Sequence, residues 1–177
     1  DLAKQYAEIA AKPIQDERRN LWRDHNSLIR TRPLIYVRWL AAWSEHPDAT
    51  PRCEDRFWQG HEHFLRQMIF QDWIGDDYII EPWITQRASV RIPEGGIWGV
   101  PYGRIPPNVP GGAWKNDPPI KSPEDLARLV KPRHEIDEES TRVNVARLQD
   151  AVGDILTVEL DRQPAWTVWH ADMSTDL

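Results

Sequence analysis

The stretch Leu34-Ile35-Tyr36-Val37-Arg38-Trp39 carries the most weight in predicting the fold. It is short, rich in β-branched and aromatic residues, and directly follows Pro33, a residue that disfavours helix in its predecessor. These features are typical of a buried strand over residues 34–39. Two further runs, residues 78–84 and residues 154–160, have the same character. The run at 78–84 contains Pro82, which indicates a strand end rather than a strand middle.

Helical patterns separate the three predicted strands. Apolar residues recur at helical spacing over residues 2–12, from Pro13 to about residue 29, over residues 54–73 and over residues 137–152. A further helix is expected to begin at Ser122, because a capping residue, a proline and two acids follow one another there. Strands that alternate with helices predict an α/β fold with adjacent parallel strands.

Residues 85–121 differ from the rest of the chain, because glycine and proline are interleaved there with arginine and tryptophan. The segment is too long for an idle connection in a compact domain. We therefore expect a β-ribbon or a binding excursion, in which Arg104 is a candidate substrate-binding residue.

Composition limits the classes of function. The chain has 177 residues, 40% of them hydrophobic, and a net charge of −6, which disfavours binding to a nucleic-acid backbone. No apolar run has the length of a membrane span, and the only cysteine, Cys53, cannot form an intramolecular disulfide or a cysteine-rich zinc site. A cytoplasmic protein without a membrane or nucleic-acid partner is expected. The 10 tryptophans favour a thick core, an interface or a wide apolar pocket.

Several stretches resemble the uroporphyrinogen decarboxylase superfamily, which also contains cobamide-dependent methyltransferases. They are Arg32 to Arg38, Gly75 to Ile84, Gly153 to Leu160 with the following Ala165-Trp166-Thr167, and the run Arg19 to Asn26, which is similar to a longer branch of the superfamily. The resemblance implies a (β/α)8 barrel of about 250 residues. The chain then supplies an N-terminal helical extension over residues 1–31 and the first β/α units of an incomplete barrel over residues 32–177.

The resemblance also implies where substrate is bound. Active sites of such barrels lie at the carboxyl ends of the strands, and Arg38 falls where the superfamily's first-strand arginine binds substrate carboxylates. Uroporphyrinogen decarboxylation needs an aspartate at the end of the second strand, and this sequence has no aspartate at the matching position. Glu81 stands one place away from that position. The candidate catalytic residues are Glu81, His170 and Asp172, and the candidate substrate-binding residues are Arg38, Trp39, Trp83, Arg104 and Trp166. We expect Arg38 and Glu81 to point into a common cleft.

Three hypotheses about function remain open. The first is one-carbon transfer linked to a corrinoid, with a small-molecule substrate and a corrinoid protein as partner. The second is decarboxylation of a tetrapyrrole or another carboxylic acid. The third is a non-catalytic half-barrel that binds a partner subunit, either the remaining half of the barrel or a second copy in a homodimer.

Metal binding within the chain is not expected. His61 and His63 are two apart on a predicted helix and therefore do not share a face, and Cys53 is more simply explained as a loop residue without a catalytic role. Zinc and a corrinoid are cofactors that the resemblance implies for the complete enzyme, with the zinc ligands outside this chain.

Overall fold

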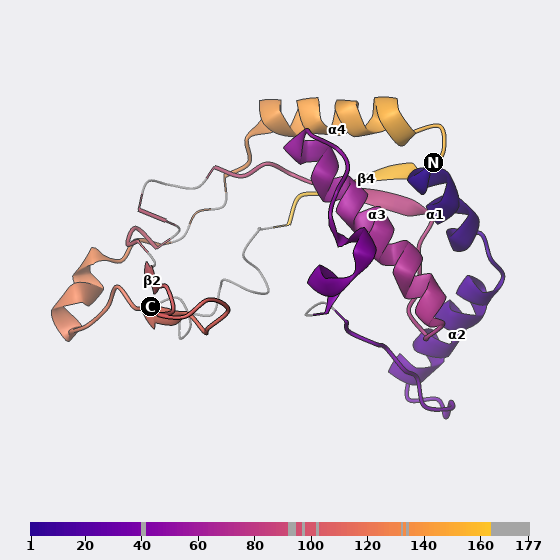
Figure 1. Cartoon of the computed structure of the whole chain (residues 1–177), viewed down its shortest axis with the longest axis horizontal. Coiled ribbons are helices and arrows are strands. Elements are labelled where there is room, and N and C mark those ends of the chain that lie inside the picture. The colour runs from indigo at the N-terminus through magenta and orange to yellow at the C-terminus, as the bar shows by residue number, and fades with distance from the viewer. Residues whose placement is uncertain are drawn as a thin grey trace. The chain divides into compact units, whose positions relative to one another are not determined.

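The computed structural model describes residues 1–39, 42–91, 95–96, 98–101, 103–131, 133 and 135–163. The chain divides into two compact units, the first made of Asp1–Thr85 with Arg147–Glu159 and the second of Gln86–Ala146 with the chain from Leu160 onward. The elements (Figure 1) are α1 (Leu2–Ala10), α2 (Ile14–Asn26), η1 (Trp43–Glu45), η2 (Pro47–Ala49), α3 (Arg56–Ile74), β1 (Trp83–Arg87), β2 (Gly103–Ile105), β3 (Lys115–Asp117), η3 (Pro123–Arg128), α4 (Glu138–Val152) and β4 (Thr157–Asp161).

The predicted helices of the first unit are confirmed, with one correction at the end of α2. Asp55 caps α3 by accepting a hydrogen bond from the Phe57 amide, and Gly75 ends it with a φ of 74°, which an L side chain rarely adopts. Helix α2 stops at Asn26 instead of residue 29. Leu28 beyond it has a φ of 59° and is 96% exposed, so the end of the predicted apolar stripe was wrong.

Helix α4 is also confirmed, whereas the helix predicted from Ser122 is only the short 3-10 turn η3. Ser122 and Asp125 form the expected capping box. The turn nevertheless ends because Leu129 is extended, and the next amide, that of Val130, donates to the carbonyl of Trp98 rather than to the helix.

Strands β1 and β4 are paired. The amide of Ala88, directly after β1, donates to the carbonyl of Asp161 at the end of β4, over 2.8 Å. In an antiparallel pair this bond would leave the two five-residue strands end to end. They can lie side by side along their length only if they are parallel. Of the three strands predicted as parallel neighbours, only the second and third are therefore neighbours, and β1 at Trp83 and β4 at Thr157 both start later than predicted.

The strand predicted over residues 34–39 was wrong, since the segment is extended but belongs to no sheet. Its backbone is bound by two carboxylates at the end of the α3 turn. The amides of Ile35 and Val37 donate to Asp77 and Asp76 over 2.8 and 2.7 Å, and the Asp77 amide donates to the Ile35 carbonyl. Side-chain oxygens thus accept the backbone hydrogen bonds that a neighbouring strand would otherwise have accepted.

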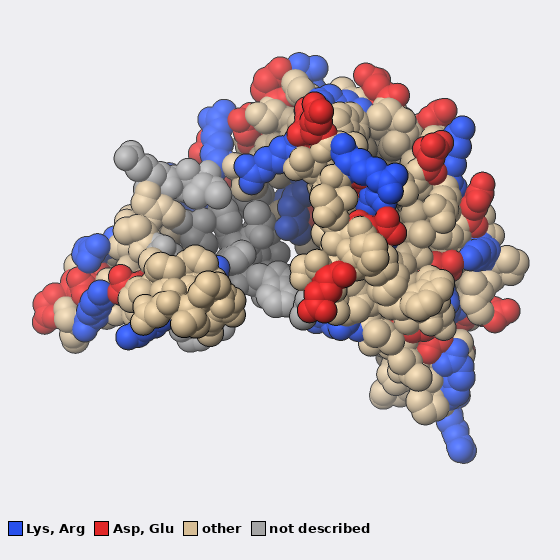
Figure 2. All heavy atoms as spheres, in the orientation of Figure 1, with Lys and Arg blue, Asp and Glu red and all other residues tan. Residues whose placement is uncertain are grey.

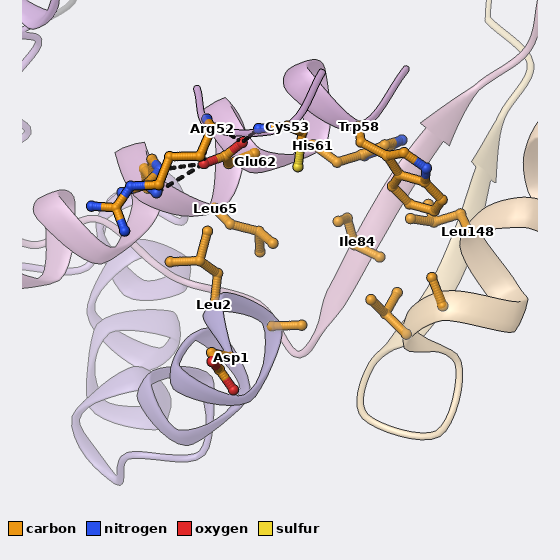
Figure 3. A pocket seen from close by; sticks show the side chains of 14 residues that line it. Asp1, Leu2, Arg52, Cys53, Trp58, His61, Glu62, Leu65, Ile84 and Leu148 are labelled. Atoms are coloured by element: carbon orange, nitrogen blue, oxygen red, sulfur yellow. Dashed lines mark hydrogen bonds and ion pairs between the residues drawn. The ribbon is translucent and has the colours of Figure 1, made fainter. Parts of the chain in front are cut away.

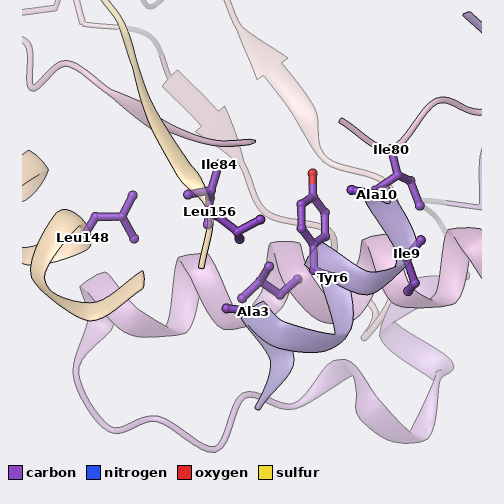
Figure 4. Close-up of a cluster of buried hydrophobic side chains, with 9 residues drawn as sticks. Ala3, Tyr6, Ile9, Ala10, Ile80, Ile84, Leu148 and Leu156 are labelled. Carbon is purple, nitrogen blue, oxygen red and sulfur yellow. The ribbon is translucent and has the colours of Figure 1, made fainter. Parts of the chain in front are cut away.

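The first unit has a buried hydrophobic core made of α1, α3, the C-terminal half of α4, β1 and β4 (Figure 4). Helix α1 packs against α3, and Ile84 and Leu148 are each only 1% exposed. Two polar side chains are satisfied inside this unit. The Tyr6 hydroxyl donates to the Trp83 carbonyl, and the fully buried Gln15 accepts the Ile80 amide over 2.9 Å. Polar groups that are buried in this way need such partners.

The second unit contains the β-ribbon predicted within residues 85–121. Strands β2 and β3 pair antiparallel, with Gly103 opposite Asp117 and Ile105 opposite Lys115. A Cβ at Gly103 would lie 3.1 Å from the Asp117 Cβ, so this close approach favours glycine. Acidic and basic side chains are interspersed over the surface seen in Figure 2. Within the described residues, no helix is long and apolar enough to cross a membrane.

Candidate functional site

The carboxyl ends of β1 and β4 place an ion pair where a barrel enzyme would bind substrate. Arg87 ends β1 and Asp161 ends β4, and the Arg87 Nε lies 3.3 Å from an Asp161 carboxylate oxygen. Arg87 is more than half exposed and Asp161 is 24% exposed. The next residue, Arg162, binds Glu138 at the start of α4. Two guanidinium groups therefore stand at this end, each with a carboxylate that a bound anion would have to displace.

A hydrogen-bond network fixes the chain that leaves β1. The Ser89 amide donates to the Thr141 hydroxyl over 3.0 Å, and the amide of Asp137 donates to the Ser89 carbonyl. The Asn144 side chain donates to the Ser89 hydroxyl, and Thr141 is only 2% exposed. The first turns of α4 thus hold the segment after the strand in one conformation, as a positioned binding loop requires.

Glu81 and Arg38 do not meet at a strand end. Glu81 precedes β1 and is bound by Arg19 of α2, whose Nε and Nη2 donate to one carboxylate oxygen over 3.0 and 2.7 Å. Arg38 is exposed. The expectation that Arg38 and Glu81 share a cleft at the carboxyl ends of strands was wrong, because Arg38 lies in no strand and Glu81 precedes β1 and pairs with Arg19.

Trp39, one of the predicted substrate-binding residues, lies at a pocket. It lines an aromatic pocket of about 290 Å³ together with Ala42, Trp43, Glu45, His46, Pro47 and Phe70. We call this the aromatic pocket. Its walls come from three places in the chain, namely the end of the extended segment, the turns η1 and η2, and the middle of α3.

The other predicted residues are dispersed. Trp83 begins β1 and is 39% exposed, and its carbonyl accepts the Tyr6 hydroxyl. Arg104 lies on β2 in the second unit and is exposed. The predicted residues Trp166, His170 and Asp172 lie outside the described residues.

A larger pocket of about 470 Å³ lies among α1, the start of α3, β1 and the end of α4 (Figure 3). Its lining is mainly apolar, with Trp58, Leu65, Ile84 and Leu148 among the wall residues. Polar groups gather on one side, namely Arg52, Cys53, His61, Glu62 and Arg66. An apolar pocket with a few convergent polar groups is typical of a small-molecule site.

Glu62 organises the polar side of the larger pocket. Its side chain is 6% exposed and accepts the amides of Arg52 and Cys53, each at 2.8 Å to the nearer oxygen, and the guanidinium of Arg66. Burial alone would raise the pKa of the carboxyl group, but these donors outweigh burial and lower the pKa to about 2. Glu62 is therefore an ionised anchor that ties the 51–53 loop to α3.

The Cys53 thiol is a poor candidate nucleophile. The nearby Glu62 carboxylate, through a side-chain hydrogen bond, raises the pKa of this thiol above its ordinary value, and burial adds to the effect. A reactive cysteine needs the opposite, a lowered pKa in a positive environment. The sequence interpretation of Cys53 as non-catalytic fits this geometry, whereas the pocket around Cys53 and His61 was not predicted. The i, i+4 pair Glu62–Arg66 beside an apolar row was the signal available.

A protein-bound metal ion needs several ligands that converge on one point. No group of three or more His, Cys, Asp or Glu side chains within the described part of the chain could hold one. The zinc implied by the resemblance therefore has no ligand set among these residues, and no step of a reaction is assigned to it.

In comparisons with known proteins, no family model matches the chain, and neither a curated protein nor a solved structure matches it significantly.

Proposed function

We propose that this chain supplies the first β/α units of a (β/α)8-barrel enzyme similar to uroporphyrinogen decarboxylase, with a small-molecule site at the carboxyl ends of its strands. One observation carries the proposal, namely the pairing of β1 with β4. The 35–37 segment lies beside Asp76 and Asp77, and the chain then continues into β1, which lies beside β4. β1 and β4 are thus neighbours whose connection ends in helix α4, and a strand followed by a helix and a neighbouring strand is the repeating unit of a barrel.

The sequence disfavours one other α/β architecture. A dinucleotide-binding sheet also joins neighbouring strands through helices, but it needs a glycine-rich turn after its first strand. Here that stretch reads Leu40-Ala41-Ala42-Trp43-Ser44 and contains no glycine.

The proposed chemistry is one-carbon transfer linked to a corrinoid, and decarboxylation of a tetrapyrrole or another carboxylic acid is the alternative. Both substrates carry anionic or amide-bearing side groups around a ring, for which Arg87 and Arg162 supply guanidinium donors. In either reaction these residues would bind and orient the substrate. A corrinoid, when bound, would supply the cobalt centre that accepts or donates the methyl group. The proposed setting is the cytoplasm, in keeping with a single cysteine.

Ligand titration followed by NMR tests the proposal. Hydroxocobalamin or the octacarboxylate uroporphyrin is added to the ¹⁵N-labelled chain, and the amides of Ala88 and Arg162 are expected to shift. A shift with cobalamin favours methyl transfer, and a shift with uroporphyrin favours decarboxylation. Arg87→Ala should weaken the effect about tenfold, whereas Arg142→Ala, whose exposed pair with Glu139 lies on α4, should not. If neither ligand shifts these amides, the proposed site is wrong.

A partner-binding half-barrel is the second candidate, and the 35–37 segment favours it. Ile35, Tyr36 and Val37 are 60, 48 and 38% exposed, although their sequence is that of a buried strand. Neighbouring exposed apolar residues on an unpaired extended edge are typical of a surface that another chain covers. The occupant would be the rest of the barrel or a second copy, and sedimentation velocity on the NMR sample distinguishes a self-associating chain from a ligand-binding monomer.

A further inference from the structure

We propose that the aromatic pocket binds a quaternary ammonium group or a similarly compact organic cation. The inference uses contacts within the first unit alone and does not depend on the enzyme proposed above. Four rings enclose the pocket, those of Trp39, Trp43, His46 and Phe70, and the carboxylate of Glu45 stands at its edge. Aromatic faces with a nearby negative charge are the surroundings that such cations prefer, because the ring quadrupole attracts positive charge.

The rings are mutually packed into a continuous wall. Trp43 and His46 stack with centroids 4.8 Å apart, and His46 lies 4.6 Å from Phe70. Trp39 meets Phe70 edge to face at 5.3 Å and Trp43 at 5.2 Å. A volume of about 290 Å³ suits a head group rather than a whole large ligand, so the remainder of the molecule would extend outward.

Hydrogen bonds behind the rings hold both indoles in place. The Trp39 Nε1–H donates to Gln71, and Gln71, which is 3% exposed, donates in turn to Asp76 over 2.7 Å. The Trp43 Nε1–H donates to the Nδ1 of His63 over 3.3 Å. The polar edges of the indoles are thus satisfied by residues that do not line the pocket. A site that is rigid before binding loses less entropy when the ligand arrives.

The charge of the pocket also favours a cation. His46 accepts the Asp48 amide through Nδ1 over 3.1 Å, which fixes the orientation of its ring in the wall. No lysine or arginine is among the lining residues. Glu45 is exposed and forms no ion pair within the described residues, so its carboxylate is available to a ligand.

A pair of isosteric probes tests this proposal. Choline carries the trimethylammonium group, and 3,3-dimethylbutan-1-ol has the same shape without the charge. Binding to the full 177-residue chain is measured by tryptophan fluorescence and calorimetry. We expect choline to bind about tenfold more tightly than the neutral alcohol, which is the size of effect that a partly desolvated cation–π site gives.

Variants separate the charge from the ring contribution. Glu45→Gln should weaken choline binding about threefold to tenfold and leave the neutral alcohol unaffected. Phe70→Leu keeps the wall apolar and should reduce the preference for choline. The matched control is Glu54→Gln, an exposed acid that does not line the pocket. Circular dichroism on each variant verifies folding. Equal binding of both probes would show an apolar pocket only, and no binding of choline would refute the site; either result overturns the proposal.

Discussion

The two units of the chain are built by different means. In the first unit, helices α1, α3 and α4 and two strands bury a common set of apolar side chains, and Ile80, Ile84 and Leu148 are each 1% exposed. The described part of the second unit buries far less, with Ala88 and Val100 as its buried apolar residues. Val109, Trp114 and Leu126 are more than half exposed there.

The difference in buried apolar surface indicates that the two units unfold with different cooperativity. Burial of apolar surface is shared among many elements, so loss of one side chain in the first unit affects all of them. The second unit relies on a three-residue ribbon, the Ser89 network and exposed ion pairs such as Arg142–Glu139. Contacts of these kinds contribute little each. We therefore expect the second unit to open locally at a lower free energy than the first unfolds.

The largest expected effect comes from removing the same atoms in each unit. Leu148→Ala should lower the free energy of unfolding of the first unit by about 2–5 kcal/mol, because it leaves a cavity at a fully buried position. Leu126→Ala, at a position that is 54% exposed, should change stability by less than about 0.5 kcal/mol. Urea denaturation followed by circular dichroism measures both. Equal losses would show that the two units form one cooperative core.

Acid provides a second comparison. A hydrogen-bonded ion pair with Arg32 lowers the pKa of Asp77 from 3.8 to about 2, against the effect of burial and with help from the Ile35 amide. Because the folded-state pKa is lowered, the contribution is fully present above about pH 4 and is lost as the pH falls toward 2. Asp77→Asn should therefore cost about 1–2 kcal/mol at neutral pH and flatten the acid transition.

The matched acid control is Asp125→Asn in the second unit. Asp125 accepts the Lys121 and Ser122 amides at the start of η3, and it lies outside the first unit's core. We expect this change to loosen the turn without moving the acid transition of the first unit. A pH titration of tryptophan fluorescence checks both variants, and an unchanged acid limb in Asp77→Asn would contradict the assigned role of the Arg32–Asp77 pair.

The sequence predicted the elements better than their pairing. Periodicity located α3 and α4 to within a few residues, because an apolar stripe and a capping aspartate or glycine are local signals. The 34–39 segment has the composition of a strand, yet composition does not say what its backbone amides bind. In the structure Asp76 and Asp77 bind these amides. Two adjacent acids after a helix do not predict such binding from the sequence.

The candidate site was predicted only in part, for a similar reason. Trp39 was predicted to bind substrate and lines the aromatic pocket, but His46 and Phe70 reach the same pocket from a turn and a helix. Their convergence depends on tertiary packing, which spacing along the chain does not contain. The ion pair of Glu81 with Arg19 was not predicted, because Arg19 lies 62 residues earlier in the chain. The roles of Trp166, His170 and Asp172 stay predictions.

The smallest expected effect concerns two glycines with left-handed backbone. Gly75 ends α3 in the first unit with a φ of 74°, and Gly111 lies in the second unit with a φ of 76°. At both positions an added Cβ would meet no atom within 4 Å, so the methyl group of alanine enters open space and only backbone strain remains. Alanine in either place should cost about 1 kcal/mol locally. If the units differ as argued, Gly75→Ala lowers the global unfolding free energy of the first unit, whereas Gly111→Ala appears only as faster amide hydrogen exchange around the β2–β3 ribbon. Global destabilisation by both variants, in denaturation and exchange alike, would mean that the second unit unfolds together with the first.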